Sequence, residues 1–193
     1  MKTDIILCGV GGQGILSIAT VIGEAATRAG LFLKQAEVHG MSQRGGDVQS
    51  NLRLSTDPIW SDLIPEGGAD LVISMEPMEA LRYLPYLSGS GRIVTASAPF
   101  VNIPDYPDAA ALEASLSALK GVVRFDIDAV AREAGNPRGA NMALLGAAAP
   151  LLGILDAAML REAVATVFAA KGDAVVQANL KAFDLGLEKG GEL

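Results

Sequence analysis

Apolar and polar positions follow two different periods along this chain, and each change of period marks a predicted element. A short apolar run, Ile5-Ile6-Leu7, precedes a glycine-rich turn, after which apolar residues recur with helical spacing from Ile15 to Ala29. This order predicts a buried strand over about 3–9 and a helix with one apolar face over 14–29.

The rest of the chain continues to alternate between predicted strands and helices. The predicted strands cover 31–38, 48–55, 71–73, 93–94 and 121–125, and the predicted helices cover 77–87, 108–119, 127–134, 140–153, 156–169 and 173–188. We expect Met78, Leu81, Tyr83 and Leu84 to face inward on their helix, which Ser88-Gly89-Ser90-Gly91 should end. Residues 99–107, with three prolines, should form an extended connection.

The segment 48–55 has its apolar residues on one parity, which is typical of a half-exposed strand that is antiparallel or at a sheet edge. The regular alternation of strands and helices predicts one α/β domain over residues 1–193. We expect a Rossmann-like fold with a mostly parallel twisted sheet, helices on both faces and a helical C-terminal part.

Composition restricts the possible partners and location. Half of the 193 residues are hydrophobic, 19% are charged, and the formal net charge is −7. Nucleic acids and anionic membranes bind to basic protein surfaces, which an acidic chain lacks, so we expect neither as a partner. The chain does not begin with basic residues followed by an apolar run, the pattern of a secretory signal, so secretion is not expected. The low-charge stretch 141–155 is too short and too interrupted to span a bilayer. A cytoplasmic protein is therefore expected.

The chain has one cysteine, Cys8, and one histidine, His39. Iron–sulfur clusters take about four ligands and structural zinc sites need several cysteines or histidines, so no metal site is expected in this chain. We expect Cys8, at the end of the first strand, to be a buried and inert thiol; a redox role is the alternative.

The turn after the first strand, residues 9–14, is called the glycine loop below. Gly9, Gly11 and Gly14 fit the G-x-G-x-x-G pattern, and Glu37 follows at the distance of a ribose-binding acid. One interpretation is therefore a free-standing NAD(P)- or FAD-binding oxidoreductase. Gln13 neither excludes nor demands a ligand, so a loop that only positions backbone is the other interpretation.

A second loop, 39–46, joins the second and third predicted strands at the expected carboxyl edge of the sheet, where open α/β folds bind ligands. Its candidate ligand-contacting residues are Ser42, Gln43, Arg44, Gly45 and Gly46. The guanidinium group of Arg44 suits a phosphate or carboxylate, and the two glycines allow a close backbone approach. A simple turn with a solvated arginine is the alternative.

Two further candidates, His39 and Asn141, have plainer interpretations. His39 lacks a nearby carboxylate or serine in a recognisable arrangement, which favours a structural or interface role over catalysis. Asn141 begins an apolar helix, so we expect it to cap that helix with Met142 in the core; an interface contact is the alternative. Asp126 and Asp128 are expected at a helix N-terminus rather than in a metal pair. The sequence has no P-loop, G-x-S-x-G or H-E-x-x-H motif.

Four motifs of the chain, in order, resemble the gamma domain of 2-oxoacid:ferredoxin oxidoreductases. They are Gly9-Val10-Gly11-Gly12-Gln13-Gly14, His39-Gly40-Met41-Ser42-Gln43-Arg44-Gly45-Gly46-Asp47-Val48, Asn141-Met142-Ala143-Leu144-Leu145-Gly146 and Asn179-Leu180-Lys181-Ala182-Phe183-Asp184-Leu185-Gly186. The form of the second motif is similar to that of the small (beta) subunit of indolepyruvate:ferredoxin oxidoreductases. The resemblance covers essentially the whole chain.

This resemblance implies oxidative decarboxylation of a 2-oxoacid to an acyl-coenzyme A with reduction of ferredoxin. It implies that thiamine diphosphate and the iron–sulfur clusters lie in a large partner subunit, with an α2β2 assembly, and that coenzyme A is a co-substrate. The small chain would then bind no cofactor alone, carry no catalytic group of its own, and be inactive without its partner. A non-catalytic accessory protein that binds coenzyme A or a nucleotide remains a further alternative.

Overall fold

A six-stranded sheet forms the centre of the protein in a computed structural model that describes residues 1–39 and 45–191. The strands in this part are β1 (Lys2–Val10), β2 (Phe32–His39), β3 (Asp47–Ser55), β4 (Ala69–Ser74), β5 (Leu87–Ala96) and β6 (Val122–Phe125). The helices are α1 (Ile15–Arg28), α2 (Pro77–Arg82), α3 (Ala109–Ser117), α4 (Ile127–Glu133), α5 (Ala140–Ala148), α6 (Ala157–Phe168) and α7 (Asp173–Gly191), with short 3-10 turns at Leu84–Tyr86, Ala149–Leu151 and Ala169–Lys171.

The strand order is β2-β3-β1-β4-β5-β6. β1, β4, β5 and β6 pair in parallel, whereas β3 is antiparallel to both β1 and β2. Among these strands only β3 therefore runs against the others, which confirms the predicted mostly parallel sheet.

β3 is antiparallel as predicted, but it lies inside the sheet and is not half-exposed. Ser50 and Asn51 are buried. The loop between β3 and β4 covers the strand on the side away from α1, where the Asn51 Oδ1 atom accepts a hydrogen bond from the Ile64 amide at 3.2 Å. The alternation of apolar and polar residues predicts a strand with one apolar and one polar face. It cannot predict that a loop later in the chain covers the polar face.

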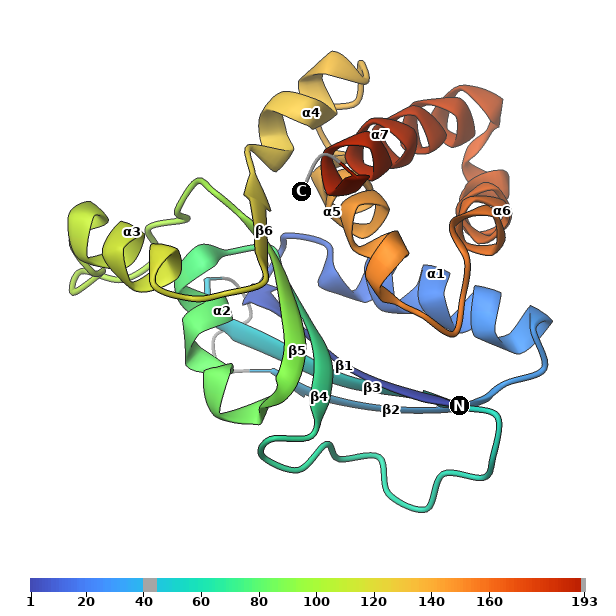
Figure 1. Cartoon of the computed structure of the whole chain (residues 1–193). Coiled ribbons are helices and arrows are strands. Elements are labelled where there is room, and N and C mark those ends of the chain that lie inside the picture. Colours follow the sequence, from blue (N-terminus) through green and yellow to red (C-terminus); the bar gives the residue numbers. More distant parts are fainter. Residues whose placement is uncertain (40–44, 192–193) are drawn as a thin grey trace.

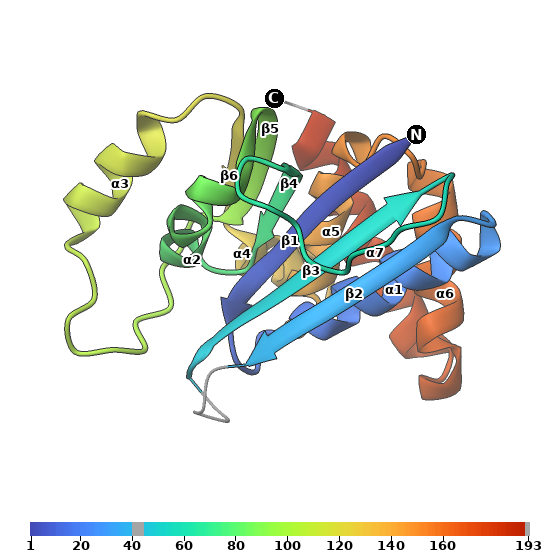
Figure 2. The same cartoon turned by 90° about the horizontal axis from the view of Figure 1, so that it is seen from below.

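Helices cover both faces of the sheet, as predicted, although unequally. α1, α5, α6 and α7 lie on one face, while α2 and α3 lie on the opposite side beside β4, β5 and β6 (Figure 1). Seen from below, no described helix lies in front of β1, β3 and β2, across which the loop between β3 and β4 runs (Figure 2). No helix in the described ranges is long and apolar enough to cross a membrane.

Proline shortens one predicted helix and so moves a strand boundary. α2 ends at Arg82 rather than at residue 87, because Pro85 lacks the amide that a continuing α-helix needs, and a 3-10 turn follows. The serine–glycine segment 88–91, predicted to end the helix, belongs to β5 instead.

The inward face of α2 also differs from the prediction. Tyr83 is buried as predicted, but Met78, Leu81 and Leu84 are only partly buried, and Glu79 and Ala80 are buried instead. The helix packs on the sheet through its small and acidic residues, which hydrophobic periodicity does not indicate. The predicted helix 140–153 is likewise shorter, since α5 ends at Ala148 and a proline-containing 3-10 turn follows.

Candidate functional site

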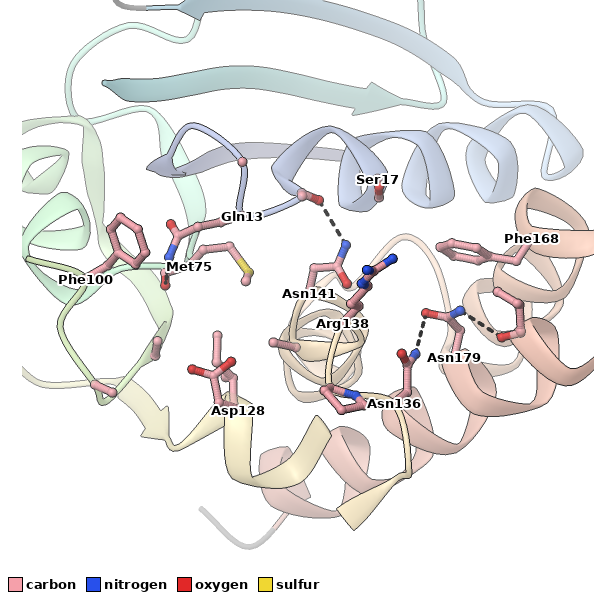
Figure 3. Close-up of a pocket in the computed structure, with 18 of the residues that line it drawn as sticks. Gln13, Ser17, Met75, Phe100, Asp128, Asn136, Arg138, Asn141, Phe168 and Asn179 are labelled. Atoms are coloured by element: carbon pink, nitrogen blue, oxygen red, sulfur yellow. Dashed lines mark hydrogen bonds between the residues drawn. The ribbon is translucent and has the colours of Figure 1, made fainter. Parts of the chain in front are cut away.

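A cavity of about 780 Å³ opens at the carboxyl ends of β1, β4 and β5. Its walls come from segments that are far apart in sequence: the glycine loop, residues 96–100, the connection between α4 and α5, and the residues around the start of α7 (Figure 3). This is the edge at which α1 leaves β1 toward one side of the sheet and the chain after β4 turns to the other. Open α/β sheets bind their ligands at such a point.

The glycine loop is fixed by its own side chain and by its neighbours. The Gln13 Oε1 atom accepts the Val10 amide at 2.7 Å, and Gln13 Nε2 donates to the Met75 carbonyl at 3.2 Å. Gly14 precedes α1 with a left-handed φ of 85°. A Cβ atom there would lie 2.7 Å from Asn141 Nδ2. Because of this left-handed backbone and this close approach, glycine is favoured at position 14.

Asn141 joins α5 to the glycine loop, and the cap interpretation is wrong. The N-cap of α5 is Gly139, and Asn141 lies in the first turn with 8% of its surface exposed. Its Nδ2 atom donates to the Gly14 carbonyl at 3.1 Å, and the side chain lines the cavity (Figure 3). Met142 is fully buried, as predicted.

The loop between β2 and β3 reaches the same edge of the sheet. The Gly11 amide donates to the Gly46 carbonyl at 2.9 Å, and Asn102 Nδ2 donates to the Gly45 carbonyl at 2.7 Å. The structure thus brings the glycine loop, the end of this second loop and the segment after β5 together. Gly45 and Gly46 do not line the cavity.

Several candidate residues of the second loop fall outside the described part of the chain. Ser42, Gln43 and Arg44 belong to the segment 40–44, and their proposed anion contact stays a prediction. The backbone of His39 pairs with Val48 at the end of β2, while its side chain lies outside the described residues.

The dinucleotide interpretation loses its second element in the structure. Glu37 lies on β2, where Gln35 Nε2 donates to its Oε1 atom at 2.5 Å, and it does not line the cavity. In dinucleotide-binding folds the second strand lies next to the first, so that its acid faces the ribose. Here β3 lies between β1 and β2 and moves Glu37 one strand further away.

Among the described residues that line the cavity of this acidic chain, two are cations, Arg138 and Lys171, and one is an acid, Asp128. Within the described residues neither cation forms an ion pair; the Lys171 Nζ atom lies 5.1 Å from the centroid of the Phe168 ring. Arg138 extends beside Asn141 in Figure 3. The N-terminus of α1 lies at the same cavity, and helix N-termini favour anions. The arrangement suits an extended anionic ligand.

Phe100 and Phe168 provide apolar parts of the cavity wall, and Asn136 and Asn179 provide polar ones. Asn136 Nδ2 donates to Asn179 Oδ1 at 3.2 Å, and Asn179 Nδ2 donates to the Val175 carbonyl at 2.8 Å (Figure 3). This pair ties the connection before α5 to α7. A mixed wall of this kind fits a ligand with both charged and apolar parts.

Cys8 is fully buried, as predicted. Burial raises the pKa of its thiol, so the reactive thiolate is disfavoured. Asp126 caps α4 by accepting the Ala129 amide at 2.8 Å, as predicted. Among the described residues, no group of three or more His, Cys, Asp or Glu side chains is arranged to hold a metal ion.

Arg138, Lys171 and Phe100 were not among the residues that the sequence indicated. Arg138 follows Asn136-Pro137 directly before α5, and Lys171 directly precedes Gly172, so both look like ordinary loop cations in sequence. The only local signal is the position of each beside a helix start, which is too common to identify a site.

Comparisons with known proteins show what the chain is similar to. Residues 4–189 match the family model described as pyruvate ferredoxin/flavodoxin oxidoreductase. The chain is 38% identical over 206 residues to the indolepyruvate oxidoreductase subunit IorB of Pyrococcus horikoshii, covering 98% of this chain and 96% of the relative.

Two solved structures have similar folds. The gamma subunit of a keto/oxoacid ferredoxin oxidoreductase from Geobacter sulfurreducens has a TM-score of 0.71 at 25% identity and covers 99% of both chains. The 2-oxoglutarate:ferredoxin oxidoreductase from Magnetococcus marinus, solved with 2-oxoglutarate, coenzyme A and succinyl-CoA bound, has a TM-score of 0.76 at 24% identity. The match covers all of this chain but only 31% of the Magnetococcus chain.

Proposed function

Since this chain belongs to the pyruvate ferredoxin/flavodoxin oxidoreductase family, we propose that its cavity holds part of the coenzyme A co-substrate at a site shared with a larger subunit. The chain is a subunit of a 2-oxoacid:ferredoxin oxidoreductase. The free-standing NAD(P)- or FAD-dependent oxidoreductase that the glycine loop also allowed is not favoured.

The proposed division of labour leaves the redox chemistry to the partner. Thiamine diphosphate would supply the decarboxylation chemistry when bound in the large subunit, which would also carry the iron–sulfur clusters that reduce ferredoxin. A chain with one buried cysteine fits the remaining role. The proposal includes an aryl 2-oxoacid such as indolepyruvate as substrate, an α2β2 assembly and a cytoplasmic location.

The observation that carries the proposal is a cationic cavity in an acidic chain. Coenzyme A has a diphosphate, a further phosphate on its ribose and a pantetheine arm, in which apolar methyl and methylene groups alternate with two amides, that ends in a thiol. The N-terminus of α1, Arg138 and Lys171 suit its phosphates, because charged donors bind phosphate oxygens strongly. Phe100 and Phe168 suit the apolar groups of that arm, and Asn136 and Asn179 suit its amides. The relative from Magnetococcus marinus, which has coenzyme A bound, supports the choice of ligand.

We expect the Arg138→Ala and Lys171→Ala variants, in the complex assembled with its large subunit, to raise the KM for coenzyme A about tenfold each. A hydrogen bond to a charged group contributes about 1.5–3 kcal/mol, and about 1.4 kcal/mol corresponds to a tenfold change in affinity. The KM for indolepyruvate should stay the same in a steady-state ferredoxin-reduction assay. Lys181→Ala, an exposed change on α7 that does not line the cavity, is the matched control. An unchanged KM for coenzyme A in both cavity variants would contradict the proposal.

Dinucleotides should not stabilise this chain. We expect millimolar NAD, NADP or FAD to leave the melting temperature of the full chain unchanged, because Glu37 does not face the cavity. A ligand present at 100 times its Kd would stabilise the fold by about 2.7 kcal/mol, which a thermal melt detects easily. A saturable increase with NAD would revive the dehydrogenase alternative.

A further inference from the structure

Glu76, the N-cap of α2 two residues after the end of β4, is a fully buried acid that the proposed chemistry does not use. Its carboxylate accepts three hydrogen bonds. Oε2 accepts the Glu79 amide at 2.9 Å, and Oε1 accepts both the Phe100 amide at 3.2 Å and the Tyr106 hydroxyl group. A buried carboxylate is stable only when such donors replace water, so this geometry is closely specified.

Two of the three donors belong to the segment between β5 and α3. Phe100 lines the cavity, whereas Tyr106 does not. Residues 99–107 contain three prolines and no helix or strand, and Phe100, Val101 and Ile103 remain exposed. With so little regular structure, the position of this segment depends on a few tertiary hydrogen bonds, and Glu76 accepts two of them.

The residue before Glu76 contacts a second part of the same wall, the glycine loop. Gln13 of the glycine loop donates to the Met75 carbonyl at 3.2 Å. Met75 and Glu76, which follow β4 in sequence, therefore connect the glycine loop to the segment after β5, and both of these line the cavity. Figure 3 shows Gln13, Met75 and Phe100 close together on one side of the cavity.

We propose that Glu76 is a positioning residue, which sets the affinity for coenzyme A by fixing the 99–107 segment as a wall of the cavity. The inference rests on the proposed function, because coenzyme A is the ligand whose binding it sets. Glu76 does not line the cavity itself and acts through the Phe100 backbone and the Tyr106 hydroxyl group.

The Tyr106 hydroxyl group is well suited to be a permanent donor. Burial raises the pKa of Tyr106, and the hydrogen bond to Glu76 raises it further. The phenol therefore keeps its proton near neutral pH and remains a donor to Glu76. The hydrogen bond between Tyr106 and Glu76 should therefore not be lost through deprotonation of the tyrosine near neutral pH.

The kinetic test uses Glu76→Gln, Tyr106→Phe and the double variant in the assembled complex. Each single variant should raise the KM for coenzyme A about fivefold or more and change kcat less than about twofold, since the wall affects binding and not the reacting atoms. The double variant should be less than additive, because both changes break the same contact. Tyr86→Phe is the matched control, since its hydroxyl group is not part of this cluster.

A second readout needs no coenzyme A. Hydrogen exchange of the Phe100 amide in the full chain should be faster in both single variants and unchanged in Tyr86→Phe. Unchanged exchange in both, or faster exchange with an unchanged KM for coenzyme A, would overturn the positioning role. The proposed function fails separately, if Arg138→Ala and Lys171→Ala leave that KM unchanged.

Discussion

The Arg53→Met variant is expected to lose about 3–5 kcal/mol of its free energy of unfolding, because it leaves a buried carboxylate without its main partner. Asp4 on β1 is fully buried, and Arg53 on β3 contacts both of its oxygens, with Nε at 2.8 Å and Nη2 at 3.0 Å. The same guanidinium group donates to the carbonyls of Ser61 and Leu63 in the loop after β3. Its removal therefore affects two strands and the loop that covers them.

Chemical denaturation with circular dichroism would measure this loss. Lys2→Met is the control, since Lys2 also contacts Asp4 Oδ2 at 2.7 Å but its side chain is 53% exposed. Water can replace the half-exposed Lys2 ammonium group, and Arg53 still contacts both Asp4 oxygens, so the control should lose no more than about 1 kcal/mol. If Arg53→Met and Lys2→Met lost the same free energy of unfolding, the buried contact between Arg53 and Asp4 would not be the source of the stability.

The Gly186→Ala variant is expected to lose about 2–3 kcal/mol, although alanine is the better helix former. α7 packs so closely on α5 that a Cβ atom at Gly186 would lie 1.9 Å from the Ala143 carbonyl oxygen. The facing position is equally close, since a Cβ atom at Gly146 would lie 2.0 Å from the Phe183 carbonyl oxygen. Backbone cannot move aside as a flexible side chain can, so the two helices must separate.

Thermal melts should show this as a fall of roughly 4–12 °C in Tm for a chain of this size. Gly191→Ala is the matched control on the same helix, because a Cβ atom there would meet nothing within 4 Å. A Gly186→Ala protein as stable as the wild type would contradict the close packing. If the cavity holds coenzyme A as proposed, the change should also weaken its binding, since α5 carries Asn141 to the glycine loop.

Local patterns in the sequence predict most of the elements of this protein because a strand or helix imposes its period on neighbouring residues. The alternation of 2.0 and 3.6 periods indicated the mostly parallel α/β sheet, and the apolar run before the glycine loop indicated β1 with its buried Cys8. Where prediction was wrong, as for the helix over 77–87, a proline near the end was the local cause. The family followed from motifs, which are also local.

The candidate site was only half predictable. The glycine loop, Asn141 and the approach of Gly45 and Gly46 came from motifs, although Asn141 holds Gly14 and does not cap its helix. Arg138, Lys171 and Phe100 carry no motif, since each lines the cavity from a different connection. Their function depends on where separate segments meet, which no window of neighbouring residues contains.

The sequence by itself determined the elements, the buried thiol and the membership of a family of oxidoreductase subunits. Only the tertiary structure decided that β3 enters between β1 and β2, which removes Glu37 from the cavity and with it the dinucleotide interpretation. The tertiary structure alone also showed that Met75 and Glu76 connect the glycine loop to the segment after β5. The physical reason is that periodicity is set by bonds between neighbours in the chain, whereas strand order and cavity walls are set by contacts between residues far apart in it.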